Sequence, residues 1–315
     1  MQNVRDLHIK KDIIPLFDTV CNDLSRDALI EIFSHPLPSP REVITRQNII
    51  KGLIEQEHLY FPFFYSTLEF NEVYAYTESM GAIPGIFARK QWEREKGRLG
   101  QLFIFLRKIE QACFSRLKAH LYPDDLKDDL KDMVTMLSDL NIDKNEAIFR
   151  NRGFTRAEAS RLINKLEEKV RKGEIARFWK AFFLFEAYLS IARGIIKNKF
   201  NFPEFKKEEL SITGFSHPLL KHPVKNSITI EKNVTLITGP NMSGKSTLLK
   251  TIGLCVYLAH IGLAVPADTC EIAFFDVISV AIDLNDDIKG WSDLKIGQLI
   301  FEQEGLDNML LTPTR

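Results

Sequence analysis

One stretch of nine residues has the types and the spacing that bind phosphate. It follows an apolar, β-branched run at residues 234–238 and reads Gly239, Pro240, Asn241, Met242, Ser243, Gly244, Lys245, Ser246 and Thr247. This is a full match to G-x-x-x-x-G-K-[ST], in which glycines let the backbone aim successive N–H groups at phosphate oxygens. Lys245 would reach the β- and γ-phosphates, and the Ser246 hydroxyl would ligate Mg²⁺. The stretch predicts a Walker A loop that binds ATP with Mg²⁺, and all nine residues are candidate ATP-binding residues.

The segments around this loop are those that a phosphate site needs. Short β-rich runs begin near Leu210, at residues 227–230 and 234–238. After the loop, apolar residues recur at helical spacing as far as Gly262, so the positive end of a helix dipole would face the phosphates. Strand, loop and helix come in the order of a P-loop NTPase domain, which we expect from residue 206 onward.

The preceding residues read as helices. Residues 39–42, Ser-Pro-Arg-Glu, and residues 155–158, Thr-Arg-Ala-Glu, each have a capping residue followed three positions later by glutamate, so a helix should start at each. The second of these helices should stop near Gly173, and a long helix should follow over residues 175–199. The predicted fold class is α plus α/β, with a helical domain at residues 1–205 and an α/β P-loop domain at residues 206–315.

Composition limits the class of protein. The 315 residues include 42 basic and 42 acidic side chains, which excludes a globally basic nucleic-acid coat and an acidic tail. Charge is uneven locally: residues 86–121 hold nine Lys or Arg against three Asp or Glu, and residues 122–146 hold eight Asp or Glu against three Lys. The basic stretch could face phosphate, but solvated helix faces with local ion pairs are the favoured interpretation.

The four cysteines, Cys21, Cys113, Cys255 and Cys270, form no C-x-x-C pair, so no zinc cluster or redox motif is indicated. The start of the chain lacks the apolar stretch of a signal peptide, and the longest nearly apolar run is too short to span a bilayer. We expect a cytoplasmic protein that does not contact the membrane. The histidines and Cys255 are interpreted as packing or surface residues.

The sequence of the loop, GPNMSGKST, resembles that of the corresponding loop in the MutS family of DNA mismatch repair ATPases. His217-Pro218 and Asn226 upstream, and residues 259–288 downstream, are also similar to the family, whereas the helical half matches more loosely at residues 16–18, 33–37, 46–47 and 201–205. The resemblance implies a helical core and lever domain with a short clamp, followed by an ABC/MutS-like ATPase domain. It also implies an ATPase that forms a homodimer through this domain, binds DNA with its helical arms and uses ATP to switch between DNA-bound states.

The sequence departs from the family at several points. It begins at the helical core, its clamp tip would be the acidic residues 122–146, and Pro223 and Val224 stand where the family often has an aromatic side chain against adenine. A Walker B aspartate followed by glutamate is not found, and the resemblance places Asp276 on an earlier strand. Because 70 residues follow Lys245, we expect a domain that is incomplete at its carboxyl end, with hydrolysis impaired and catalytic residues unknown.

Two other function classes remain open at this point. One is a non-catalytic nucleotide-binding protein that acts through interactions of its helical domain. The other is a P-loop phosphotransferase, which is disfavoured because no lid-like arginine cluster follows the loop. Binding without turnover would argue against the phosphotransferase, and salt-dependent DNA binding would favour the MutS-like protein.

Overall fold

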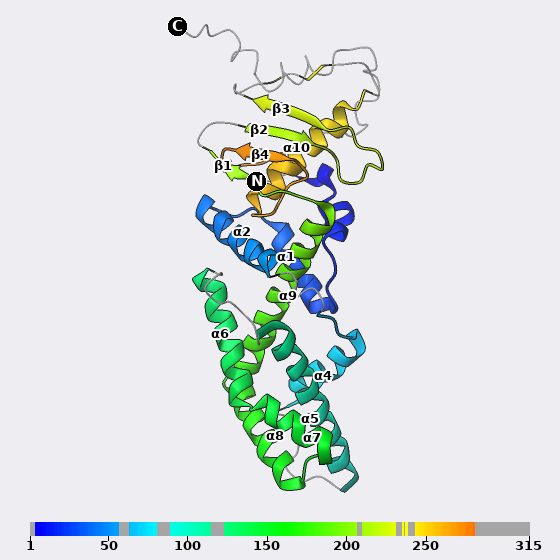
Figure 1. Ribbon diagram of the computed structural model, residues 1–315, viewed down its shortest axis with the longest axis vertical. Helices are drawn as coiled ribbons and strands as arrows, with labels where there is room; N and C mark the ends of the chain where they lie inside the picture. Colours follow the sequence, from blue (N-terminus) through cyan, green and yellow to red (C-terminus); the bar gives the residue numbers. More distant parts are fainter. Residues whose placement is uncertain are drawn as a thin grey trace. The chain divides into compact units, whose positions relative to one another are not determined.

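A computed structural model of the protein (Figure 1) describes residues 4–56, 63–80, 89–114, 123–206, 210–230, 235, 237–238 and 243–280. These residues form one compact unit that ends at Val280. The domain boundary expected near residue 206 lies within this unit, directly after the first strand, and the division into two domains stays a prediction.

Helices make up most of the part that precedes the sheet. The N-terminal residues form three short turns, η1 (Arg5–Leu7), η2 (Ile9–Ile13) and η3 (Ile14–Leu16), and η4 (Glu110–Phe114) extends α5. The longer helices are α1 (Asp23–Ser34), α2 (Pro40–Glu55), α4 (Thr67–Ser79), α5 (Arg89–Ile109), α6 (Asp124–Asp139), α7 (Ile142–Arg152), α8 (Arg156–Arg171) and α9 (Glu174–Asn198). None of the helices described combines the length and the apolar character needed to cross a bilayer.

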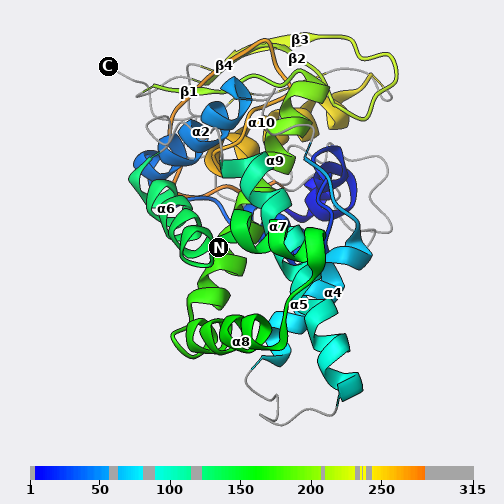
Figure 2. The ribbon, with the colours of Figure 1, turned by 60° about the horizontal axis from the view of Figure 1, so that its bottom comes forward.

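The long helix α9 organises this part of the molecule, because α1, α2, α6 and α8 all pack against it (Figures 1 and 2). Its buried Trp179 contacts the rings of Phe70 from α4 and Phe105 from α5. Burial of such rings removes a large apolar area from water and is the main favourable term in folding.

Local hydrogen bonds explain where two of these helices begin, as the sequence predicts. The Ser39 side chain accepts the Glu42 N–H at the start of α2, and Thr155 forms a complete capping box with Glu158 at the start of α8. The second helix gives way to Gly173, whose φ of 70° lies in the left-handed region that glycine tolerates. Both predicted helices are therefore confirmed, together with the long helix after them.

The strands form a small mixed sheet in the order β1-β4-β2-β3, with β1 (Glu204–Phe205), β2 (Leu210–Phe215), β3 (Asn226–Ile230) and β4 (Thr269–Ile272). Among these described strands, β1 and β4 pair in parallel, and the β2–β3 and β2–β4 pairs are antiparallel. The helix α10 (Lys245–His260) contacts β2, α2 and η1. The strand predicted at residues 227–230 is confirmed. In the run at 234–238, the described residues 235, 237 and 238 are not in a strand. The described chain is thus an α and β protein without a complete P-loop NTPase fold.

Candidate functional site

The second half of the predicted Walker A loop forms the start of α10. Ser243 and Gly244 form an exposed bend, and Gly244 occupies the N-cap position with a φ of 88°. Intrahelical bonding begins where the Leu248 N–H donates to the Gly244 carbonyl over 2.9 Å. A residue with a Cβ would be strained at this φ, so the local backbone conformation explains why the motif has glycine at this position.

The first turn of α10 suits an anion. Ser246 is exposed, Lys245 and Thr247 are half-buried, and the turn contains no acidic residue. The first N–H groups of a helix lack intrahelical partners and carry the positive end of its dipole. Gly239, Pro240, Asn241 and Met242 lie outside the described residues, so the phosphate-binding geometry predicted for the whole loop stays a prediction.

The opposite end of α10 is held by the helical part of the molecule. The Tyr257 hydroxyl donates to the Phe33 carbonyl over 2.7 Å, and the Leu37 N–H donates to the His260 carbonyl over 2.9 Å. Arg46 Nη1 donates to the Ile261 carbonyl over 2.8 Å and places a positive charge at the negative end of the helix. The candidate site therefore stands on a helix anchored to α1 and α2.

His260 is a core residue, as the sequence interpretation holds. Its Nδ1 lies 2.7 Å from the Val256 carbonyl, and its Nε2 accepts the Phe275 N–H over 2.8 Å. These partners require a neutral ring with the proton on Nδ1. Burial lowers the pKa of His260 below its ordinary value. The ring packs against Phe205 and Phe274, so it ties the segment after β4 to α10.

Asp276 lies exposed beyond the end of β4. Among the residues described, no group of three or more His, Cys, Asp or Glu could hold a metal ion. Cys21, Cys255 and Cys270 are free thiols. A magnesium site at Ser246 would therefore rest on this hydroxyl together with water and phosphate oxygens, which is usual for magnesium bound to a nucleotide.

The segment upstream of Asn226 lines a cavity of about 670 Å³. His217 and Pro223 form part of its wall, whereas Val224 is 78% exposed. Burial lowers the pKa of His217; the Asp12 carboxylate opposes this shift and the Lys250 charge adds to it. Phe202 also lines the cavity, an aromatic side chain that sequence reasoning missed because it lies on the far side of the predicted domain boundary.

The described part of the basic stretch makes local ion pairs, as favoured from sequence. Arg98 lies 3.4 Å from Glu95 and over the ring of Tyr76, and Lys108 pairs with Glu69 over 2.6 Å. Other pairs in this region are Lys96–Glu93, Arg107–Glu110 and Arg107–Asp143.

The acidic stretch forms α6 and the start of α7. Its apolar residues Leu126, Leu130, Met133 and Leu137 are buried, and α6 packs along α9. The acidic side chains Asp128, Asp129 and Asp132 are exposed. The stretch thus presents a solvated acidic helix face, and its place at the tip of a clamp stays a prediction.

Comparison with known proteins points to one family. Residues 235–298 match the family model for MutS domain V. The chain is 31% identical over 153 residues to the DNA mismatch repair protein MutS of Thermus thermophilus, a match that covers 47% of this chain and 19% of that protein. It is 39% identical over 110 residues to MutS of Haloquadratum walsbyi and 36% identical over 111 residues to MutS of Thermotoga maritima. These two matches each cover 33% of this chain and 12% and 14% of the respective proteins, so the chain spans under a fifth of the curated relatives that it matches.

Proposed function

Because the chain belongs to the MutS family, we propose that it binds ATP with Mg²⁺ through residues 239–247 and binds DNA through its helical half. The observation that carries the nucleotide proposal is the start of α10, where a left-handed Gly244 is followed by Lys245 and an exposed Ser246 on a turn without acidic residues. A nucleotide triphosphate would bring negative charge to the positive end of this helix.

We further propose that this chain hydrolyses ATP slowly. A P-loop ATPase holds magnesium with a Walker B aspartate on a neighbouring strand, and MutS proteins add a glutamate beside it. These 315 residues contain no Asp-Glu dipeptide, and Asp276 stands beyond a strand that pairs with β1 and β2. We also propose that two copies of the chain assemble through the ATPase half and that the protein is cytoplasmic.

The nucleotide proposal is tested by equilibrium binding of a fluorescent ATP analogue, with and without Mg²⁺, alongside a phosphate-release assay. Loss of the phosphate-binding lysine in Lys245→Ala should weaken binding by about tenfold or more, since charge-assisted hydrogen bonds to phosphate are among the strong ones. Lys221→Ala is the matched control because Lys221 is an exposed lysine outside the loop. Equal binding by the wild type and Lys245→Ala would refute the proposed site, and rapid phosphate release would refute slow hydrolysis.

The DNA proposal is tested by measuring the affinity for short duplexes as a function of salt. Phosphate contacts release counterions, so the affinity should fall steeply between about 50 and 200 mM salt. In α5, Lys96, Arg98, Arg107 and Lys108 already have acidic partners, so we expect few phosphate contacts from these four residues. If no duplex binds at low salt while nucleotide still does, the nucleotide-binding interaction protein is the better description.

A further inference from the structure

One face of α9 carries small and polar residues on an otherwise apolar helix. Glu186, Ser190, Gly194 and Asn198 follow each other at intervals of four, so they lie on the same side of the helix. All four contact residues 16–22, which precede α1. We call this row the α9 ladder and residues 4–22 the N-terminal strap.

The C-terminal part of the α9 ladder, from Ser190 to Asn198, fixes the register of the strap. Asn198 Nδ2 donates to the Leu16 carbonyl over 3.1 Å, and Ser190 Oγ donates to the Phe17 carbonyl over 2.5 Å while accepting the Thr19 N–H over 2.7 Å. Between them, Gly194 allows a close approach, because a Cβ there would lie 2.6 Å from Phe17 Cδ1 and 2.8 Å from Phe17 Cα. The strap therefore runs antiparallel to α9 in one defined position.

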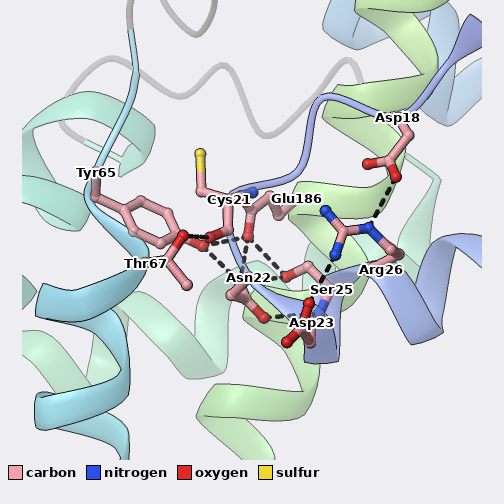
Figure 3. Close-up of polar contacts among 9 residues, drawn as sticks. All are labelled: Asp18, Cys21, Asn22, Asp23, Ser25, Arg26, Tyr65, Thr67 and Glu186. Atoms are coloured by element: carbon pink, nitrogen blue, oxygen red, sulfur yellow. Dashed lines mark hydrogen bonds and ion pairs between the residues drawn. The ribbon is translucent and has the colours of Figure 1, made fainter. Parts of the chain in front are cut away.

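The N-terminal member of the ladder, Glu186, is a buried carboxylate that accepts hydrogen bonds from four uncharged donors (Figure 3). Glu186 is 2% exposed, and it accepts the Cys21 N–H and Asn22 Nδ2, each over 2.8 Å. It also accepts the Ser25 hydroxyl over 2.6 Å and the Tyr65 hydroxyl over 2.5 Å. Displacing the strap would remove two of these donors together, the Cys21 N–H and Asn22 Nδ2, and leave the buried carboxylate with only the Ser25 and Tyr65 hydroxyls. The docked strap is thus stabilised when all four donors are in place and destabilised when some are missing. We therefore expect the strap to be either fully docked or fully undocked rather than partly shifted.

The other end of the strap contacts the elements of the candidate nucleotide site. Leu7 in η1 is buried, its Cδ2 lies 3.4 Å from where a Cβ on Gly253 would stand, and η1 packs on α10. Asp12 in η2 lies close enough to His217 for its charge to act on that imidazole. The strap is therefore continuous from α10 and the segment around His217 to the middle of α9.

We propose that the N-terminal strap couples nucleotide binding at the start of α10 to its own docking on the α9 ladder. This inference rests on the proposed nucleotide site. Nucleotide bound at the first turn of α10 would hold the helix against which Leu7 packs and so favour the docked strap. Coupling between nucleotide binding and strap docking is reciprocal. A substitution that undocks the strap must therefore weaken nucleotide binding by the same factor by which nucleotide favours the docked strap.

Hydrogen–deuterium exchange of the full chain tests this coupling, with a non-hydrolysable ATP analogue and Mg²⁺ as the probe. In the wild type, the analogue should slow exchange in peptides covering residues 16–22 by about fivefold, at the low end of typical coupling energies. Lys245→Ala should abolish this protection. Ser190→Ala should speed exchange of the same peptides and weaken analogue binding, because it removes three hydrogen bonds to Phe17 and Thr19 of the strap with little change in volume.

Two further variants separate coupling from general loss of structure. Lys197→Ala changes an exposed residue of α9 outside the ladder and should alter neither readout. Glu186→Gln should have the same effect as Ser190→Ala. The four donors share two carboxylate oxygens in the wild type, whereas the glutamine amide offers one acceptor oxygen. If both ladder variants fail to fold, the wild-type exchange measurement alone decides.

The outcomes also separate this inference from the proposed function. Analogue binding that depends on Lys245, with unchanged exchange at residues 16–22 and unchanged affinity in Ser190→Ala, would overturn the coupling and leave the nucleotide site standing. A wild type that does not bind the analogue would overturn both.

Discussion

At the scale of single residues, His260 links protonation to the stability of the sheet region. Its two ring nitrogens both have backbone partners inside the core, and only the neutral ring fits them. Because burial lowers the pKa of His260, the folded state binds a proton at this site less readily than the unfolded state, whose value is near 6.5. The contribution of this residue to stability is complete above pH 6.5 and declines as the pH falls towards the folded-state pKa.

We therefore predict that the free energy of unfolding decreases below pH 6.5, by at most about 1.4 kcal/mol per pH unit from this group. His260→Gln should be less stable than the wild type at pH 7.5 by about 1–3 kcal/mol, because the Phe275 N–H loses a well-placed acceptor. Its stability should also depend less on pH between about 5 and 6.5. Urea unfolding at several pH values measures both effects, with His222→Gln as the control because His222 is exposed. Parallel pH profiles for wild type and His260→Gln would contradict the assignment.

At the scale of elements, α9 contains a glycine whose role is opposite to that of a glycine in α5. Glycine within a helix ordinarily costs about 1 kcal/mol relative to alanine. At Gly97 in α5 an added Cβ would have no neighbour within 4 Å, whereas at Gly194 it would stand 2.8 Å from the backbone of Phe17. Helix propensity alone would make both alanine variants stabilising, so the pair isolates the effect of the close contact.

Gly194→Ala should therefore lower the free energy of unfolding by about 1–3 kcal/mol, because a backbone neighbour cannot move aside as a side chain could. Gly97→Ala should raise it by about 0.5–1 kcal/mol. Chemical denaturation of the two variants beside the wild type gives both differences. A stabilised Gly194→Ala would show that residues 16–22 do not lie against α9 in solution.

The capping box of α8 offers a third comparison at this scale. Thr155 satisfies the Glu158 N–H, and Glu158 in turn accepts the Thr155 N–H and pairs with Arg152. Thr155→Ala should cost about 1 kcal/mol of stability, whereas Thr155→Ser, which keeps the hydroxyl, should cost less than half of that. Thermal unfolding followed by circular dichroism would measure both, and equal losses for the two variants would exclude the hydroxyl as the cause.

These elements differ in how far the sequence predicts them. The starts of α2 and α8 depend on hydrogen bonds between residues three apart, so a short window of sequence is enough. The α9 ladder joins residues far apart in the chain, since Glu186 and Cys21 are separated by 165 positions, and no local pattern predicts such a contact. The four-residue recurrence of polar or small residues in an apolar helix distinguishes one face of α9 but does not indicate what that face contacts. The second predicted strand and the first half of the Walker A loop lie partly or wholly outside the described residues, and there the prediction rests on the motif.

At the scale of the whole molecule, a bound nucleotide should stabilise the entire unit that ends at Val280, because α10 is hydrogen-bonded to α1 and α2 as well as packed on the sheet. A ligand that binds only the folded state at about one hundred times its dissociation constant adds about 2.7 kcal/mol of stability. For a unit of this size the midpoint of thermal unfolding should rise by roughly 5–10 °C with ATP and Mg²⁺. The rise should be absent in Lys245→Ala and should persist through a long incubation with ATP, because slow hydrolysis leaves the ligand intact. Differential scanning fluorimetry after different incubation times measures this. A rise that decays with ATP but not with a non-hydrolysable analogue would show that the chain has a hydrolytic site despite lacking an Asp-Glu dipeptide.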